Sequence, residues 1–479
     1  MLLATHADGG FHLRHAVQQE IREPNDEYPD FYGKSRESFA DITARQLMKA
    51  AVLGFGNVAA ATIEHFMRNE DLIRSKVRTP IEFVHVATRS PARAQGRVPQ
   101  GCHVSNDCWA LVNDVDVDVV LELTGDVALA RQLLLQALAN RKHVITANKA
   151  LLAQHGEEIL CKADEVERSV LFEGAVAVSI PIIKTLRESA AANRISSITG
   201  VLNGTSNYVL WQMSEHGVDF ATAIADAQRK GYAEANPSLD VSGEDAAHKL
   251  TLLASLGFGV PINFGAVEFQ GIEAIDQRDI QFAQRLGYRI KLIAQARMAS
   301  SGLFVSVRPT LVPIASMLAQ VGEAMNGITL QGDLLGTAFL YGSGAGGRQT
   351  ASAVLADLIE LANRGGSANT GGAFNMGFRR SHVATRNVHY SREHVAAFYI
   401  RLTLDDQAGM LAKVSQVLAD TDVSVNVLLQ DVGHGGQTDL IAITHKTTSR
   451  QLRNMLPKLQ EAAGPGHSVV IHPVLGEVD

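Results

Sequence analysis

A glycine-rich turn between a short apolar segment and a helical segment is the feature that most restricts the fold of this chain. Residues 50–53 are apolar and run into Gly54-x-Gly56-x-x-Ala59, after which a helical pattern continues to Arg68. Such a turn is typical of a dinucleotide-binding sheet, because the glycines let the backbone approach a pyrophosphate that rests on the helix N-terminus. The candidate cofactor contacts here are Gly54, Phe55, Gly56, Asn57 and Val58.

The segments after this turn alternate between strand and helix patterns. Strand patterns cover residues 81–88, 115–123, 143–147 and 170–173, and helix patterns cover residues 128–139 and 151–168. A lone glycine motif is weak support for a nucleotide site, but this alternation favours a doubly wound parallel sheet. We therefore predict an α/β fold that begins with a Rossmann-type domain.

Three residues at strand ends are candidate ligand contacts, since ligands of open α/β sheets bind at the carboxyl ends of the strands. Arg89 stands where an acid would bind a ribose 2′-hydroxyl, and an arginine there suits a 2′-phosphate. This favours NADP(H) over NAD(H), with a plain solvated arginine as the alternative. Thr124 and Lys149 follow the next two strands, and a solvated lysine at a helix start is the alternative for Lys149.

Length and composition narrow the class of protein. A chain of 479 residues is too long for one core, so two or three domains are expected. A net charge of −7 without a long basic run argues against nucleic acid as a partner. No apolar run approaches the ~18 residues that span a membrane. Cys102, Cys108 and Cys161 lack metal-ligand spacing, so a reducing cytoplasm is expected.

Residues 231–249 are the strongest candidate for the chemistry. Ser242 and, three residues later, Asp245 predict a capping box that opens a helix, which puts Asp245 and Lys249 one turn apart on one face. The alternative is a surface ion pair, the usual explanation of an isolated pair at this spacing. The preceding loop adds two acids, Glu234 and Asp240.

The remaining segments fill in the organisation. Asn203-Gly-Thr205 is either turn chemistry or a set of donors to a small polar substrate. Residues 265–345 are expected to alternate strands with helices beneath the site, and a second glycine-rich turn at 341–347 would return the chain to the cofactor. Residues 365–391 have the composition of a linker. Beyond it, the order strand, helix, strand, strand, helix, strand predicts a ferredoxin-like unit.

Taken together, these segments resemble the homoserine dehydrogenase family, whose members interconvert L-aspartate 4-semialdehyde and L-homoserine. The similarity covers about residues 49–361, and the tail resembles an ACT regulatory domain. Its most specific motifs are Gly200-Val-Leu-Asn-Gly-Thr-Ser-Asn-Tyr208, Gly231-Tyr-Ala-Glu234, Leu239-Asp-Val241, Asp245-Ala-Ala-His-Lys249, Gly342-x-Gly-Ala-Gly346 and Thr350-Ala-Ser-Ala-Val354.

The residue patterns and the resemblance together divide the chain into five parts. These are an irregular extension (1–47), a dinucleotide-binding domain (48–175 with a return segment at about 342–363), a catalytic and dimerisation domain (176–341), a linker (364–394) and an ACT-like regulatory domain (395–479). We expect a homodimer or homotetramer in threonine, methionine and isoleucine biosynthesis. An amino-acid effector is expected at the ACT-like domain, with Gly409, Met410, Leu411 and Asn426 as candidate contacts.

The resemblance also implies roles for the site residues. Lys249 would carry the proton, Glu234 and Asp245 would bind the substrate, and Asp240 would help to hold it. Lys149 would lie at the junction of cofactor and substrate. The implied cofactor contacts further along the chain are Gly231 and Gly346, and the implied monovalent cation (sodium) donors are the Glu173 side chain and the carbonyls of Val176, Val178 and Ile180.

The chain departs from the family pattern at two places that matter for these roles. Val178-Ser179 replaces a usual Gly-Gly pair, which puts the cation site in doubt, and Asn236 replaces a usual Asp near the substrate amine. Two other functions stay open: a catalytically inactive amino-acid-sensing regulator, and a dehydrogenase of another amino-acid aldehyde.

Overall fold

The computed structural model describes residues 47–364, 375–385, 388–432 and 436–476. The predicted N-terminal extension lies outside these ranges except for Leu47, and so does the first part of the predicted linker. All the described residues belong to one compact unit, Gln46–Asp479.

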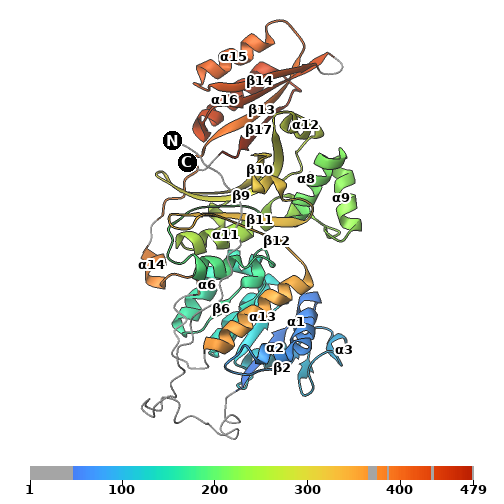
Figure 1. Ribbon diagram of the computed structural model, residues 1–479, viewed down its shortest axis with the longest axis vertical. Coiled ribbons are helices and arrows are strands. Elements are labelled where there is room, and N and C mark those ends of the chain that lie inside the picture. Colours follow the sequence, from blue (N-terminus) through green and yellow to red (C-terminus); the bar gives the residue numbers. More distant parts are fainter. Residues whose placement is uncertain (1–46, 365–374, 386–387, 433–435, 477–479) are drawn as a thin grey trace, which may run out of the picture. The chain divides into compact units, whose positions relative to one another are not determined.

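A parallel six-stranded sheet forms the first part of the described chain (Figure 1), with strand order β3-β2-β1-β4-β5-β6. This is the order of a Rossmann-type sheet, as the alternation of segments predicts. Its strands are β1 (Met48–Leu53), β2 (Ile81–Ala87), β3 (His103–Ser105), β4 (Val119–Glu122), β5 (His143–Thr146) and β6 (Val170–Leu171). Its helices are α1 (Asn57–Arg68), α2 (Glu70–Arg74), α3 (Pro91–Ala94), α4 (Cys108–Asn113), α5 (Val127–Ala139) and α6 (Lys149–Glu165).

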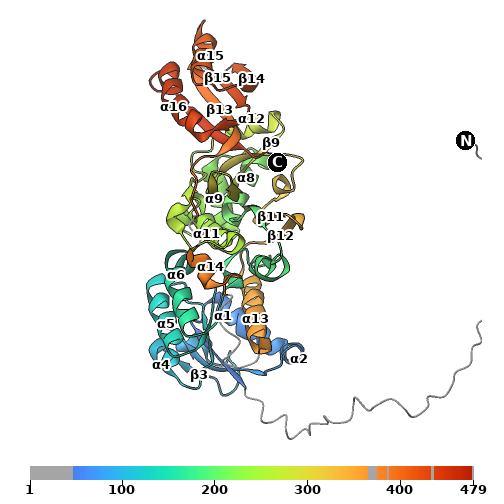
Figure 2. The same ribbon diagram turned by 90° about the vertical axis from the view of Figure 1, so that its left-hand side faces the viewer.

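Helices cover both faces of this sheet. One face packs against α5 and α6, and the other against α1 and against α13 (Gly347–Arg364), which comes back from much later in the chain. Figure 2 shows α5 and α6 on one side and α13 on the other. Buried Leu358 of α13 lies in the same apolar cluster as Ile63 of α1 and Val52 of β1. The second glycine-rich turn therefore does return the chain to the first sheet.

A mixed sheet of eleven strands makes up most of the rest of the described chain, with the main order β12-β11-β7-β9-β10-β17-β13-β15-β14. Its first strands are β7 (Ile195–Val201), β8 (Glu268–Phe269), β9 (Tyr288–Ala299), β10 (Gly302–Pro313), β11 (Met325–Gly332) and β12 (Gly336–Ser343). Strands β8, β9 and β10 match the three expected near 266–269, 289–297 and 303–311, and α12 lies between the first two, but the alternation with helices does not continue, because β9–β10 and β11–β12 are antiparallel hairpins. The helices on this part are α7 (Ile182–Lys184), continued by a π-helical turn (Thr185–Ser189), α8 (Gly204–His216), α9 (Phe220–Arg229), α10 (Ser238–Val241), α11 (Glu244–Phe258) and α12 (Gln277–Arg285).

The C-terminal unit has the predicted element order. Strands β17, β13, β15 and β14 lie side by side and antiparallel, and α15 and α16 pack on them, as in a ferredoxin-like unit. Its elements are β13 (Val395–Asp405), α15 (Met410–Asp420), β14 (Val425–Val432), β15 (Gln437–Thr444), β16 (Thr447–Thr448), α16 (Ser449–Ala463) and β17 (Val469–Val474). The strands of this unit are continuous with the mixed sheet, since β17 pairs with β10 at Val474 and Leu311.

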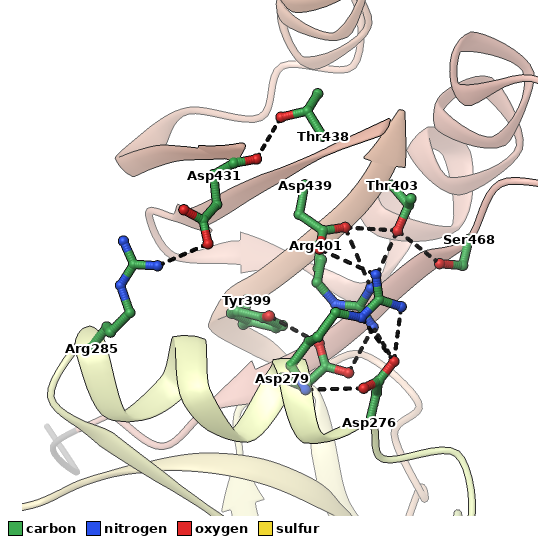
Figure 3. Close-up of polar contacts among 11 residues, drawn as sticks. Asp276, Asp279, Arg285, Tyr399, Arg401, Thr403, Asp431, Thr438, Asp439 and Ser468 are labelled. Atoms are coloured by element: carbon green, nitrogen blue, oxygen red, sulfur yellow. Dashed lines mark hydrogen bonds and ion pairs between the residues drawn. The ribbon is translucent and has the colours of Figure 1, made fainter. Parts of the chain in front are cut away.

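A buried ionic cluster ties the C-terminal unit to α12 (Figure 3). Arg401 of β13 donates from Nε to Asp279 Oδ1 (2.6 Å) and from Nη2 to Oδ2 (2.9 Å), and Tyr399 donates to the same carboxylate (2.9 Å). Both partners are buried, with side-chain exposures of 2% for Arg401 and 0% for Asp279. Thr403 joins Arg401 to Asp439, which also pairs with Arg278.

The described residues of the predicted linker are packed against the rest of the chain. Asn375 accepts a hydrogen bond from the backbone of Val170, Met376 is buried, and α14 (Arg380–Thr385) carries an ion pair from Arg380 to Glu157. Composition does not reveal these contacts, because a polar, glycine-rich sequence predicts only that the segment can be irregular.

Candidate active site

An ion pair on α11 lies at the centre of the site. Lys249 Nζ is 2.8 Å from Asp245 Oδ2, one helical turn away, and the two side chains are only 8% and 12% exposed. The same nitrogen donates to the carbonyl of Leu202 (2.7 Å), just after β7. The alternative of a surface ion pair is therefore wrong.

Lys149 binds the other oxygen of the same carboxylate. It is the first residue of α6, and its Nζ lies 3.1 Å from Asp245 Oδ1. A cation at a helix N-terminus opposes the helix dipole, so its position here depends on a negative partner. Asp245, with smaller effects from Asp240 and Glu234, raises the pKa of Lys149 above its usual value. The alternative of a merely solvated lysine is wrong.

Two cations determine the ionisation of Asp245. Burial acts to raise the pKa of this carboxyl, but Lys249, Lys149 and a hydrogen bond from Asn203 hold it well below its usual range. Asp245 is consequently a fixed anion that holds two amines beside each other.

Asn203 connects the acids. Its Nδ2 donates to Asp240 Oδ1 (2.7 Å) and to Asp245 Oδ2 (2.8 Å), while its Oδ1 caps α8 by accepting from the backbone of Ser206 (2.7 Å). From the sequence, Asn203 was predicted only to belong to a turn or to donate hydrogen bonds to the substrate. Its role as a bridge between two carboxylates was missed, although its place before a helix predicts the cap.

The start of α11 differs from the predicted capping box. The N-cap is Gly243, in the left-handed region at φ 85°, and no side chain caps the helix. A Cβ at this position would lie 3.2 Å from the carbonyl oxygen of Gln270, so a close approach of backbone requires glycine here. Ser242 instead hydrogen-bonds weakly to the backbone of Leu239 and Glu244.

The other predicted substrate residues lie around this pair. Asp240 belongs to the short helix α10 and is partly buried, and burial, with the charge of Asp245, raises its pKa. Glu234 is exposed in the turn that follows Gly231, and Asn236 accepts from the backbone of Ser238 (3.2 Å). Glu234 lies close enough to influence the pKa of Lys149.

The turn between β1 and α1 has the geometry of a phosphate cradle. Gly54 has φ 91°, and a Cβ there would lie 2.9 Å from the Leu123 carbonyl oxygen. A Cβ on Gly56, the N-cap of α1, would meet nothing within 4 Å, and no side chain caps this helix. Open space beside uncapped helix amides fits a pyrophosphate. Gly347, at the start of α13, approaches the Asn57 carbonyl, and Gly346 before it has φ 126°.

A buried carboxylate organises the neighbouring strand ends. Glu122, fully buried at the end of β4, accepts from Thr124 N (2.9 Å), Thr124 Oγ1 (2.7 Å) and Thr146 Oγ1 (2.6 Å). Thr146 in turn accepts from the backbone of Asn148, next to Lys149. Glu122 therefore fixes the turn that carries Thr124 and the turn that leads to Lys149, a role that its apolar strand did not predict.

The remaining predicted contacts occupy separate places. Arg89 is exposed just beyond β2, and Phe55 is buried beneath the guanidinium of Arg97. Gly231 has φ 76° in the turn after α9. Among the predicted effector contacts, Gly409 is the N-cap of α15, Met410 begins that helix, and Leu411 and Asn426 are exposed.

The predicted cation donors lie along one short segment. Glu173 is buried, and its carboxylate accepts from the backbone of Ile183 (3.1 Å) and Lys184 (2.8 Å); burial raises its pKa to about 7. The Ile180 carbonyl accepts from Ile182 (2.7 Å); Val176, earlier in this segment, is buried, whereas Val178 is half-buried. In the described ranges, no three His, Cys, Asp or Glu side chains are grouped as metal ligands.

Comparison with known protein families decides the identity. A model of homoserine dehydrogenase matches residues 181–359, and a model of the homoserine dehydrogenase NAD-binding domain matches residues 54–173. The homoserine dehydrogenase of Neisseria gonorrhoeae is 38% identical over 411 residues, which is 85% of this chain and 94% of that protein. The chain belongs to the homoserine dehydrogenase family. The homoserine dehydrogenase of Pseudomonas aeruginosa is 36% identical and covers 88% of this chain and 98% of its own length.

Solved structures of homoserine dehydrogenases share the fold. The structure of a homoserine dehydrogenase from Thiobacillus denitrificans superposes with a TM-score of 0.84 at 36% identity and covers 90% of this chain and 98% of its own. A hyperthermophilic archaeal homoserine dehydrogenase, solved in complex with NADPH, has a TM-score of 0.56 at 25% identity and covers 66% of this chain and 97% of its own. Among the described residues, no helix is both long and apolar enough to cross a membrane.

The chain is thus an oxidoreductase with a homoserine dehydrogenase function, and the alternative of an inactive sensor is not supported.

Proposed function

We propose that Lys249 is the proton donor and acceptor in the interconversion of L-aspartate 4-semialdehyde and L-homoserine. The observation that carries this assignment is the buried carboxylate of Asp245, which holds Lys249 on one oxygen and Lys149 on the other. A nicotinamide cofactor, when bound, supplies the hydride. Charge that develops on the substrate oxygen is then stabilised and protonated by an ammonium in a water-poor site.

The geometry of Lys249 leaves one proton for the substrate. An ammonium has three N–H donors, and in this site Asp245 and the Leu202 carbonyl accept two of them. The two contacts fix the position of the Lys249 nitrogen, so its third N–H bond has one orientation and not many. Lys149 is more exposed, at 36%, and is the competing donor.

The acids beside the pair are proposed to bind the α-ammonium of the substrate. Asp240 and Glu234 lie next to an amine-rich site and carry no full lysine or arginine ion pair among the described residues. A partly buried carboxylate such as Asp240 would be left unmatched by an analogue that lacks the amine, which gives selectivity. Asn236 lowers the negative charge of this loop, and a related amino-acid aldehyde is therefore the second candidate substrate.

The preferred cofactor is proposed to be NADP(H). Arg89 is exposed beyond β2, where a 2′-phosphate would lie, and a homologous archaeal enzyme was solved with NADPH. We also propose that a monovalent cation, such as sodium, binds near Glu173. Its carboxylate accepts two backbone N–H groups and keeps further lone pairs. Burial raises its pKa to about 7, and a cation beside it would favour the charged form.

The C-terminal unit is proposed to be an ACT-like regulatory domain in a homodimeric or homotetrameric cytoplasmic enzyme. Its antiparallel order β17-β13-β15-β14 with two covering helices supports the assignment. Gly409, Met410, Leu411 and Asn426 remain the candidate effector contacts, and threonine is the first effector to try.

The direct test is the oxidation of NADPH by the full chain in the presence of L-aspartate 4-semialdehyde, followed at 340 nm. Rapid oxidation that requires the semialdehyde supports the function, whereas faster turnover of another amino-acid aldehyde would favour the second substrate. The same assay with and without sodium or potassium tests the cation.

A further inference from the structure

A buried asparagine touches the same carbonyl as the proposed proton donor. Asn326, the second residue of β11, is 0% exposed, and its Nδ2 donates to the Leu202 carbonyl at 2.9 Å. Lys249 Nζ donates to that oxygen at 2.7 Å. One carbonyl therefore accepts both a neutral and a charged donor, and no solvent reaches the asparagine that contributes the neutral one.

The amide group of Asn326 also lies against the turn between β12 and α13. A Cβ on Gly344 would lie 2.2 Å from Asn326 Oδ1, 2.3 Å from Cγ and 2.4 Å from Nδ2, so only a glycine allows this turn to pass so close. Among the described residues, Oδ1 has no hydrogen-bond partner. The turn continues through Gly346 to Gly347, which approaches the Asn57 carbonyl of the phosphate cradle.

The segment that carries Asn326 is itself anchored. Asn207 Nδ2 of α8 lies within hydrogen-bond distance of the carbonyls of Val321 (3.0 Å), Glu323 (2.9 Å) and Met325 (3.2 Å), and its two N–H groups bind among them. Lys291 donates to Asn207 Oδ1 at 2.9 Å. The backbone just before Asn326 cannot shift without breaking several buried hydrogen bonds, so the asparagine is held rigidly.

We propose that Asn326 is a positioning residue for Lys249. Its hydrogen bond fixes the orientation of the Leu202 carbonyl, and this carbonyl in turn fixes the position of Lys249 Nζ. Asn326 also lies beside the turn that leads to the proposed cofactor site. This inference rests on the proposed role of Lys249. The Leu202 carbonyl oxygen accepts from both Asn326 and Lys249. Loss of the hydrogen bond from Asn326 therefore changes how strongly this oxygen stabilises the protonated form of Lys249.

The test uses Asn326→Asp, which keeps the volume of the side chain but replaces the amide donor by an oxygen. A carboxylate cannot donate to Leu202, whereas a protonated carboxyl can. We expect kcat to fall about 10–100-fold near pH 8, the scale of a small misplacement of a catalytic group, with the dissociation constant of NADPH within about twofold. The ratio of variant to wild-type kcat should rise as the pH falls, because protonation restores a donor.

Asn326→Ala should lose kcat similarly, but with a ratio that does not recover at low pH. Thr329→Ala on the same strand is the control, and thermal unfolding shows whether each variant is folded. Wild-type kcat in Asn326→Asp, or a ratio that does not change with pH, would overturn the proposal. Lys249→Ala is measured in parallel: if it keeps its turnover, the proposed function fails, whereas loss in Lys249→Ala with normal turnover in Asn326→Asp refutes only the positioning role.

Discussion

Lys249 and Lys149 bind opposite oxygens of one carboxylate, at 2.8 Å and 3.1 Å from Asp245. The two amines are therefore neighbours, but only Lys249 also contacts the Leu202 carbonyl and is 8% exposed. The difference in burial is what separates the proposed proton donor from its competitor.

Replacement of Lys249 by alanine should reduce kcat about 10²–10⁴-fold, the usual contribution of a positioned acid or base. The dissociation constant of NADPH, measured by fluorescence titration, should stay close to the wild-type value, since Lys249 is anchored on the substrate side. Lys149→Ala should reduce kcat less and weaken binding more. Lys162→Ala, which removes a surface lysine paired with Glu165, is the control. The reverse ranking of the two active-site variants would make Lys149 the donor.

The specificity constant for NADPH should exceed that for NADH, and Arg89→Asp should reverse the preference. An acid at this position would bind the ribose 2′-hydroxyl and repel a 2′-phosphate. Both constants come from initial rates with each cofactor. Arg74→Asp, on exposed α2, makes the same charge change elsewhere and should leave the ratio unaltered. An unchanged ratio in Arg89→Asp would show that this side chain is only solvated.

Arg401→Met should lower the free energy of unfolding by about 3–5 kcal/mol, because Asp279 would remain as an uncompensated buried charge. Urea unfolding followed by circular dichroism measures this loss. Arg285→Ala breaks the exposed pair with Asp431 and should cost only about 0–1 kcal/mol. The double variant Asp279→Leu/Arg401→Met should recover much of the stability; a double variant as unstable as Arg401→Met would show that packing, not charge, is lost.

Stability should fall on acidification partly through His472. This ring is buried against Tyr399, and within the described chain neither of its nitrogens has a hydrogen-bond partner. Burial lowers its pKa to about 4, with Arg401 acting in the same direction and Asp279 opposing. The folded state thus binds the proton less well than an unfolded histidine of pKa ~6.5, so its stabilising effect is complete above about pH 6.5 and is lost towards pH 4.

The expected loss from this group is about 3 kcal/mol over that interval. His472→Leu should remove this part of the pH dependence, which unfolding curves at pH 7, 6, 5 and 4 would measure. The exposed His445 provides a control, as His445→Leu should leave the slope unchanged. Equal slopes in the wild type and His472→Leu would exclude the histidine as the source.

Local patterns predicted the features that depend on local geometry. The spacing of Asp245 and Lys249 placed both on one face of α11, and the glycines at 54 and 56 predicted the turn that the structure contains. The prediction of a capping box was wrong because the N-cap is Gly243, where the Gln270 carbonyl oxygen lies too close for a side chain. Gln270 is 27 positions further along the chain, so no local pattern contains this contact.

Features that depend on distant partners could not be predicted. Asn203 meets Asp240 and Asp245 across 37 and 42 positions, and Arg401 meets Asp279 across 122. An isolated arginine in a strand indicates an exposed edge as readily as a buried charge, so only the fold shows that it is paired. The pairing of β17 with β10 could not be predicted for the same reason, because the sequence pattern of a strand does not identify the strand with which it pairs.

The pairing of β17 with β10 limits how the C-terminal unit can act. A sensor on a flexible tether can rotate without disturbing its enzyme, but here Leu475 donates to the Leu311 carbonyl (2.8 Å) and the sheet runs on through β9 to β7. Strand β7 ends immediately before Leu202, the residue whose carbonyl holds Lys249. Any tilt of the C-terminal unit must either break this backbone bond or twist the sheet, and β7 of that sheet leads directly to the carbonyl that holds Lys249, the proposed proton donor.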